Sequence, residues 1–221
     1  KPLIPFWNTV PSIDLEEAKN LGLRPKRVVG PISWAEQTVL FNELPELNRD
    51  MCLFKVNTGC REQEVCQLHW SWLVQRDDGI WYFEIPEGFV KNRMMRVVVL
   101  NDIARSVIQK RMGDHPKYVF VYKDHSLSRM NGTAFRKARR RATKKLPNLK
   151  NVGVHNLKHT YGARLRVAGV PEEDRNFLTG HKGRMSMTTY YSVPELTKML
   201  EYSNRVCKLD DRLILLKRKA G

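Results

Sequence analysis

The chain has 221 residues and carries 39 Lys and Arg against 23 Asp and Glu, which gives a formal net charge of +16. A chain of this length can bury a sizeable core without support from disulfides or metals. The charge favours a polyanionic partner, with nucleic acid ahead of an acidic membrane surface. The apolar runs are far shorter than the roughly 20 residues of a membrane-spanning helix, and no secretory signal pattern occurs, so we expect no membrane insertion.

Four cysteines, Cys52, Cys60, Cys66 and Cys207, are scattered along the chain without a Cys-x-x-Cys pair. This spacing argues against a zinc ribbon and against a thioredoxin-like redox site. We expect the four to be buried as small apolar side chains, in a reducing, intracellular compartment.

The first part of the chain predicts an arm followed by two helices. Residues 1–30 contain four prolines and no sustained apolar period, which indicates a linker or wrapping arm. Ser33 and Glu36 have the spacing of a capping box, so a helix is predicted from there to about Leu44. A second helix is predicted over 50–56.

The segment after Gly59 combines a helical pattern with a basic residue. Val65, Leu68 and Trp72 recur at helical intervals, and Arg61 lies in the first predicted turn. Free backbone amides at the start of a helix attract anions, so this position of Arg61 suits a phosphate.

The pattern then changes to strand-like runs. Residues 73–85 form two such runs around Asp78-Gly79, a strong hairpin signal, and 96–100 adds a third strand. From Asn101 onward the chain is predicted to be mainly helical, with a short strand at 118–121. The predicted helices cover 102–112, 131–145, 155–168, 171–178, 184–191 and 195–206. The expected fold class is therefore α+β, mainly α, with a small three-stranded antiparallel sheet.

The segment 136–145 holds seven basic residues among ten. On a helix these side chains cannot all point one way, and one interpretation is a solvated surface without a ligand. Given the charge of the whole chain, we predict instead that the segment contacts DNA phosphates. The predicted contacts are Arg136, Arg139, Arg140 and Lys144.

Four motifs follow one another between residues 58 and 192. They read TGCREQE at 58–64, VK at 90–91 with RVVVL at 96–100, HNLKHT at 155–160, and LTGH at 178–181 with MTTYYS at 187–192. Each is weak alone, but the set in this order resembles the catalytic domain of the tyrosine recombinases, the phage integrase family. The resemblance implies their DNA breaking-rejoining fold, here over 31–206.

The resemblance also implies a role for each matched residue, and the side-chain chemistry suits these roles. Arg61 would clamp two phosphate oxygens through its planar fork. Lys91 would protonate the leaving 5′ oxygen, because a lysine proton can leave. His155 and His181 would donate to the phosphate or carry the proton of the tyrosine. Glu64 would orient Arg61, and the alternative is a plain surface glutamate.

Lys158 departs from the family pattern, in which a second arginine is commoner at this place. A lysine keeps the positive charge but loses the bidentate fork. We interpret Lys158 as the phosphate ligand of a natural subfamily, and the alternative is a weakened or inactive enzyme.

The nucleophile is ambiguous by one position. An offset of nine residues from His181, which is usual in the family, leads to Tyr190, whereas the flanking motif leads to Tyr191. We predict Tyr191. Either phenol, with an ordinary pKa of about 10, needs cationic neighbours and a base to attack phosphorus.

His155 and His159 are also four residues apart on a predicted helix, a spacing used by zinc sites. Asn156 stands where the zinc-protease motif has its glutamate, so we expect no metal and interpret His159 as a buried, hydrogen-bonded histidine.

The implied activity is site-specific recombination of double-stranded DNA. A tyrosine attacks the phosphate, a 3′-phosphotyrosyl link forms and a 5′ hydroxyl leaves, with no cofactor. By the same resemblance, a homotetramer would act on two paired sites in the cytoplasm, associated with the nucleoid. The apolar pattern in the tail 207–221 fits docking on a neighbouring copy or a self-packed terminal helix.

We expect the N-terminal helical domain of the family, which closes around DNA, to be absent from this chain. Two other functions stay open. A type IB topoisomerase is the alternative enzyme, and an architectural DNA-binding protein that has lost catalysis is the alternative without chemistry.

Overall fold

The architecture comes from a computed structural model, which describes residues 30–90, 94–130, 132–181 and 193–207. This part of the chain is mainly helical and contains a three-stranded antiparallel sheet in the order β1-β2-β3, which confirms the predicted fold class. The helices are α2 (Trp34–Asn42), α3 (Glu46–Thr58), α4 (Glu62–Cys66), α5 (Asp102–Arg111), α6 (Thr133–Lys145), α7 (Val154–Val167), α8 (Glu172–Thr179) and α9 (Val193–Asn204). The strands are β1 (Leu73–Gln75), β2 (Trp81–Ile85), β3 (Arg96–Val99), β4 (Val121–Tyr122) and β5 (His125–Ser126).

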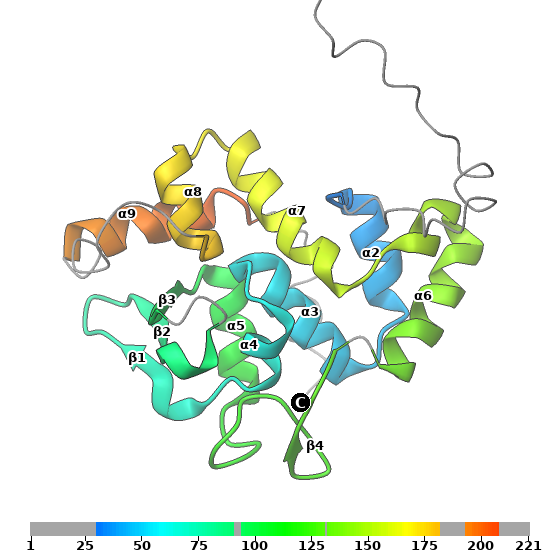
Figure 1. Cartoon of the computed structure of the whole chain (residues 1–221), viewed down its shortest axis with the longest axis horizontal. Coiled ribbons are helices and arrows are strands. Elements are labelled where there is room, and N and C mark those ends of the chain that lie inside the picture. Colours follow the sequence, from blue (N-terminus) through cyan, green and yellow to red (C-terminus); the bar gives the residue numbers. More distant parts are fainter. Residues whose placement is uncertain (1–29, 91–93, 131, 182–192, 208–221) are drawn as a thin grey trace, which may run out of the picture.

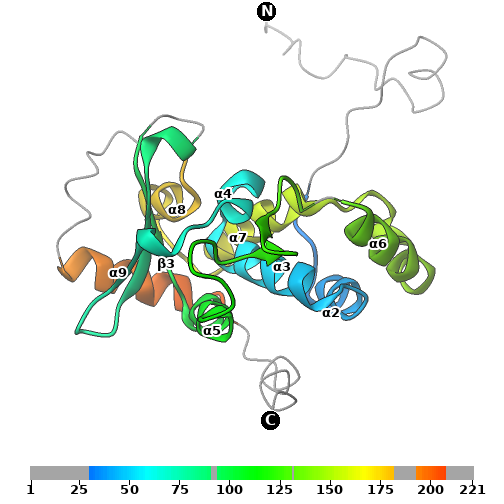
Figure 2. The same ribbon diagram turned by 90° about the horizontal axis from the view of Figure 1, so that it is seen from below.

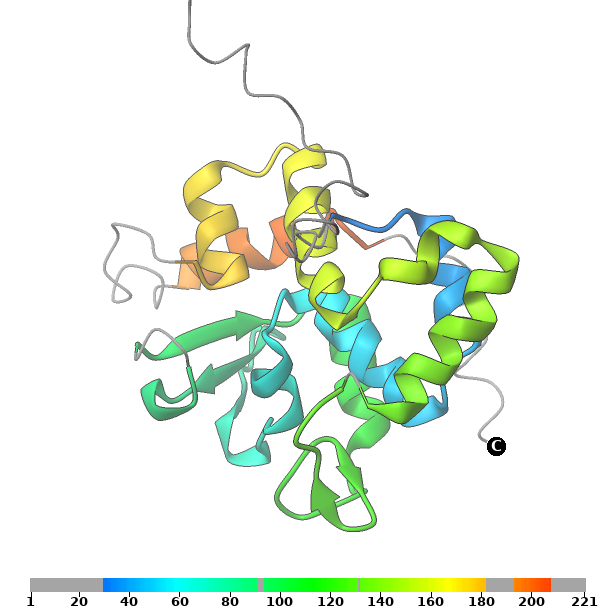
Figure 3. The same ribbon diagram turned by 45° about the vertical axis from the view of Figure 1, so that its right-hand side comes forward.

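One end of the molecule is helical, and the other end contains the sheet. Helices α2 and α6 pack together at one end, the sheet lies at the other end, and α3 lies between them, packed on α5 (Figure 1). The view from below shows the same separation (Figure 2). Helix α7 packs on α3, and α8 and α9 cover the sheet at β3 (Figure 3).

The sheet is buried on both faces because successive side chains of a strand point to opposite sides. Phe83 lies opposite Val98 in the register, and both belong to the larger core around α3. Tyr82 lies opposite Val99, and both belong to a second core with α7, α8 and α9. The sheet therefore joins two cores, and its strand β3 lies next to α8.

Helix α2 begins at the predicted capping box. Ser33 N donates to Glu36 Oε2 at 2.8 Å, and Glu36 N donates to Ser33 Oγ at 3.2 Å. Helix α3 begins earlier than predicted, because Pro45 stands extended at its N-cap and Arg49 N donates to Pro45 O at 2.9 Å. The helix thus starts four residues before its predicted start at Asp50.

The helix predicted after Arg61 is shorter than expected and ends at Cys66. The residues that follow pair with a distant segment. Trp70 N donates to Lys117 O at 3.0 Å, and Val119 N donates to Leu68 O at 2.9 Å. These long-range hydrogen bonds use backbone groups that a longer helix would need.

The strand predicted at 118–121 is displaced along the chain. Strands β4 and β5 form a small hairpin that the sequence analysis missed, because its turn contains no glycine. Lys123 and Asp124 both take positive φ angles, 51° and 59°, as a tight hairpin turn requires. The helix predicted at 184–191 lies outside the described residues, and so do 1–29 and 208–221 of the predicted arm and tail.

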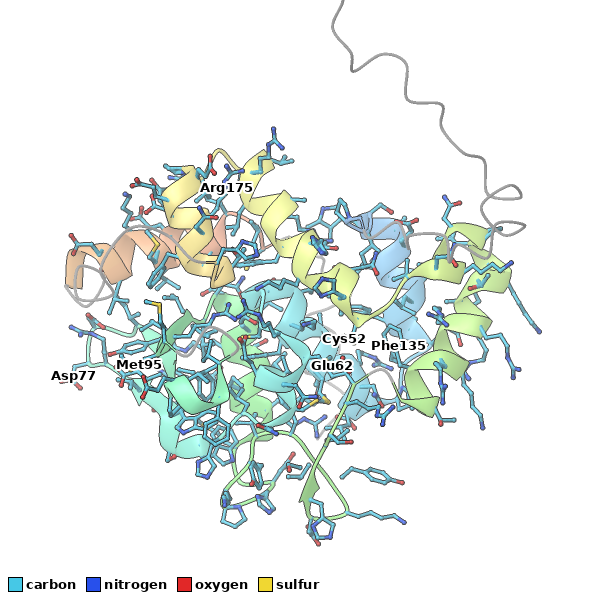
Figure 4. All side chains as sticks on the ribbon, in the orientation of Figure 1. Cys52, Glu62, Asp77, Met95, Phe135 and Arg175 are labelled. Carbon is cyan, nitrogen blue, oxygen red and sulfur yellow. The ribbon has the colours of Figure 1, made fainter. Side chains whose placement is uncertain are left out.

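The four cysteines are free. Cys52, Cys60 and Cys66 are buried as predicted, whereas the prediction of burial is wrong for Cys207, which is half-buried. Figure 4 shows Cys52 near the middle of the molecule, whereas Asp77 and Met95 lie at the outer end of the sheet. No helix in the described part of the chain combines the length and the apolar character needed to cross a membrane.

Candidate active site

Two helices end close together, and each ends in a Thr-Gly pair. Helix α3 ends at Thr58, with Gly59 in the left-handed conformation at φ 62°, and α8 ends at Thr179, with Gly180 at φ 64°. This backbone conformation favours glycine at a helix C-terminus. A Cβ atom on Gly180 would also lie only 2.5 Å from Nε of Arg96, so this glycine admits a buried guanidinium.

Helix C-termini leave backbone carbonyls without partners inside the helix. Arg96, which projects from β3 and is buried, supplies donors to both helix ends. Its Nη2 donates to Thr58 O at 3.3 Å and to Leu178 O at 3.2 Å, while its Nη1 donates to the carboxylate of Glu64. One guanidinium therefore joins α3, α4 and α8.

Lys158 of α7 makes a second connection between the same helix ends. Its side chain is 6% exposed, and its Nζ donates to Gly59 O at 3.0 Å and to Thr179 O. Burial, followed by the charges of Arg96 and Arg61, lowers the pKa of Lys158 to about 7. The sequence-based hypothesis that Lys158 contacts a phosphate stays a prediction.

Lys55 of α3 is a further buried cation that the sequence analysis missed. Its Nζ donates to Cys60 O, and burial lowers its pKa to about 8. Three consecutive carbonyls, those of residues 58–60, thus each accept a hydrogen bond from a buried basic side chain. A signal was present, since Lys55 interrupts an otherwise apolar helix interior at 51–56.

Arg61 stands at the N-cap of α4, directly after these carbonyls. Its Nη1 donates to Glu64 Oε1 at 2.9 Å, its backbone N donates to Glu64 Oε2 at 2.7 Å, and its Nη2 donates to Gly180 O at 3.2 Å. The side chain remains 23% exposed, so part of it reaches the surface. These contacts fix its orientation before any ligand binds.

Glu64 is 2% exposed, so the alternative of a plain surface glutamate is wrong. Burial by itself raises the pKa of Glu64, but the positive charges of Arg96 and Arg61 outweigh burial and lower it. The carboxylate is therefore charged at neutral pH and orients Arg61 from below the surface.

His155 and His181 are both exposed and lie near this cluster. Each ring is partly shielded from water by its neighbours. This partial burial and then His159 lower the pKa of His155, whereas partial burial and then Lys158 lower the pKa of His181. Arg61 contributes to both shifts, which places the two imidazoles within electrostatic range of the same guanidinium. His181 Nδ1 is 3.0 Å from Thr179 Oγ1. Both imidazoles are consequently biased to the neutral form at pH 7.

The prediction that His159 is buried is wrong. The buried face of α7 carries Leu157, Tyr161 and Leu165, and residues four apart such as His155 and His159 share the opposite, exposed face. Their rings lie 4.7 Å apart, edge to face. Within the described residues, no third His, Cys, Asp or Glu joins them in a group that could hold a metal ion.

Three predicted site residues, Lys91, Tyr190 and Tyr191, lie outside the described residues. The described site thus brings together Arg61, His155, Lys158 and His181, with Glu64 and Arg96 behind them. Sequence analysis included Arg96 only as part of a motif, because nothing in its spacing distinguishes a buried arginine from an exposed one.

Helix α6 carries the predicted DNA contacts. Phe135, Ala138 and Ala142 form its buried face, and the opposite face exposes Arg136, Arg140 and Lys144. Arg139 differs from these three because it is half-buried and its Nη1 donates to Val152 O at 2.9 Å.

Comparison with known proteins gives the family. The model of the phage integrase family matches residues 34–195, which include Arg61, His155, Lys158 and His181. The chain belongs to the phage integrase family. It is 33% identical over 141 residues to the integrase of Salmonella phage P22, a match that spans 60% of this chain and about a third (35%) of that relative.

Solved structures of other tyrosine recombinases and integrases share the fold of this phage integrase family member. The integrase of mycobacterium phage Brujita has a TM-score of 0.59 at 20% identity, with 87% of this chain and 64% of that chain covered. The Tn1549 transposon integrase in complex with transposon right end DNA has a TM-score of 0.55 at 14% identity, with 92% and 70% covered. The XerH site-specific recombinase bound to a palindromic difH substrate has a TM-score of 0.53 at 16% identity, with 90% and 54% covered.

Proposed function

We propose that this member of the phage integrase family is a site-specific recombinase that cuts and rejoins DNA strands through a covalent 3′-phosphotyrosine. The observation that carries the proposal is the orientation of Arg61. Its guanidinium is held by Glu64 and by Gly180 O, while 23% of the side chain stays exposed within electrostatic range of His155 and His181. Donors fixed in advance around a phosphate stabilise the charge that develops on its oxygens during displacement.

The neutral bias of the two exposed histidines supports a role in proton transfer. A neutral imidazole accepts a proton at pH 7, so His155 or His181 can take the proton of the attacking phenol. In this mechanism Tyr191 attacks phosphorus, the bond to the 5′ oxygen breaks, and Lys91 protonates that oxygen. Attack by a 5′ hydroxyl then reverses the step and releases the tyrosine.

Double-stranded DNA is the proposed partner. The exposed face of α6 with Arg136, Arg140 and Lys144 offers cations for DNA phosphates. The solved structures of the Tn1549 integrase and of XerH, which are similar to this chain, are complexes with their DNA. We also propose that this chain acts in the cytoplasm, as a homotetramer on two paired DNA sites.

Trapping the covalent intermediate tests the proposal. The substrates are nicked duplexes of randomised sequence. After cleavage the short strand that carries the 5′ hydroxyl dissociates, so this hydroxyl can no longer displace the attached tyrosine and the covalent adduct accumulates. We expect a covalent protein–DNA adduct that Tyr191→Phe abolishes and that the neighbouring control Tyr190→Phe retains. Normal DNA binding without any adduct would contradict the proposal and favour the architectural alternative.

The reaction on intact DNA separates the two enzymatic functions. A recombinase exchanges strands between two intact duplexes, whereas a type IB topoisomerase reseals the duplex that it nicks and relaxes its supercoils. We expect recombinant products from two duplexes.

A further inference from the structure

Lys158 occupies the place where a phosphate ligand was predicted, but its surroundings do not suit that task. The phosphate of a duplex reaches only groups at the protein surface, and Lys158 is 6% exposed. Its Nζ already donates to Gly59 O and Thr179 O, which leaves at most one N–H for another partner. Arg61, by contrast, keeps 23% of its side chain exposed.

Successive backbone carbonyls at the end of α3 and at the end of α8 are connected pairwise by the same donor side chains. Arg96 joins the carbonyls of residues 58 and 178, and Lys158 joins those of residues 59 and 179. Arg61 then donates to the next carbonyl, that of Gly180. From the Arg96 connection to the Lys158 connection, the accepting carbonyl therefore advances by one residue on the α3 side and by one residue on the α8 side.

Both active-site residues that follow these ends depend on this alignment. Arg61 comes two residues after Gly59, and His181 comes two residues after Thr179. A shift of one helix end against the other would move Arg61 relative to His181, and a displacement of a reacting group by about 1 Å can slow a reaction about a hundredfold.

We propose that Lys158 is a positioning residue, which links the end of α3 to the end of α8 and thereby sets the placement of Arg61 relative to His181, without touching the scissile phosphate. Any test of this role that measures DNA cleavage rests on the proposed recombinase function. The link itself is a property of the DNA-free chain.

Hydrogen exchange of the DNA-free chain tests the link. Gly59 N donates to Lys55 O and His181 N donates to Asn176 O, both at 2.9 Å, so both amides report on the helix ends. In Lys158→Met we expect both to lose about tenfold or more of their protection, while the amide of Ile108 in α5 keeps its protection. Met has a volume similar to that of Lys and removes a charge whose burial is itself costly, while the carbonyls of Gly59 and Thr179 lose this donor, so we expect a moderately destabilised variant that still folds.

Lys55→Met provides the matched control. Lys55 is also a buried lysine, and its Nζ donates to the carbonyl of Cys60, with no hydrogen bond to α8 among the described residues. We expect this variant to expose the amide of Gly59 and to leave that of His181 protected. Unchanged protection at both amides in Lys158→Met, or loss at His181 in both variants alike, would overturn the proposal.

Cleavage of a neutral substrate distinguishes positioning from direct contact. A methylphosphonate at the scissile position replaces one charged oxygen by a methyl group, so a side chain that neutralises this oxygen is no longer needed. We expect Lys158→Met to be about a hundredfold slower than the unsubstituted chain on both substrates, and Arg61→Ala to recover on the neutral one. Recovery of Lys158→Met on the methylphosphonate would overturn the proposal.

Failure of the recombinase proposal has a different signature. In that case the unsubstituted chain forms no adduct with either substrate, while hydrogen exchange still reports whether Lys158 links the two helix ends.

Discussion

The basic residues at the two helix ends and those on α6 carry the same charge in opposite surroundings. Lys158 and Arg96 are buried and bound to backbone carbonyls, whereas Arg136, Arg140 and Lys144 are exposed on a helix face turned away from the core. A buried cation without its partners is costly, so its position is closely determined. An exposed cation strengthens DNA binding by adding to the total positive charge near the phosphates, so its exact position matters little.

Removing the charge of Glu64 should have the largest effect. Glu64→Gln leaves Arg96 buried without its counter-charge, and loss of one partner of a buried pair costs about 3 kcal/mol. We expect the free energy of unfolding, measured by urea titration, to fall by this amount. Glu201→Gln, at an exposed position of α9, is the control and should stay within about 0.5 kcal/mol. Equal changes in both variants would contradict a buried ion pair.

The lowered pKa of Lys158 predicts a rise of stability with pH. The folded chain releases this proton near pH 7, because Lys158 is buried and faces Arg96 and Arg61, which outweigh Glu64, whereas the unfolded chain keeps the proton until about pH 10.5. Between these values the unfolded state binds more protons, so the free energy of unfolding increases as the pH rises.

From pH 7 to pH 8.5 this increase should reach about 2 kcal/mol. Lys55, whose pKa is about 8, adds a smaller part in the same direction. Lys158→Met should lose most of the increase in urea titrations at the two pH values, which lie below the ordinary cysteine pKa of 9.0. An unchanged slope in the variant would show that Lys158 titrates as an exposed lysine does.

Neutralising the exposed face of α6 should have the smallest effect on stability. The triple variant Arg136→Gln, Arg140→Gln, Lys144→Gln should unfold within about 0.5 kcal/mol of the unsubstituted chain per substitution. DNA binding should weaken, and the slope of log affinity against log salt should become shallower by about 2 to 3.

Arg141→Gln is the control for this face, because Arg141 Nε is paired with Glu43 Oε2 at 2.7 Å. Fluorescence anisotropy across a salt series should show a smaller change in slope for this variant than for the triple variant. A triple variant with an unaltered salt slope would place the DNA path elsewhere.

The capping box at Ser33 and the hairpin around Asp78-Gly79 were predictable, because short-range hydrogen bonds and turn preferences act between neighbours in the sequence. The end of α4 at Cys66 was not, because the segment at Leu68 pairs with a partner about fifty residues away at Val119. Likewise, the burial of Glu64 on α4 depends on Arg96 from strand β3.

For the site, the sequence by itself determined the chemical types and their order: an arginine, a histidine, a lysine where an arginine is commoner in the family, a second histidine, and adjacent tyrosines. Only the tertiary structure decided that Lys158 turns inward to two carbonyls while Arg61 stays partly exposed. The reason is physical. A motif specifies which donors a chain carries, but the acceptors that compete for them, here the free carbonyls at the ends of α3 and α8, come together only when the helices pack.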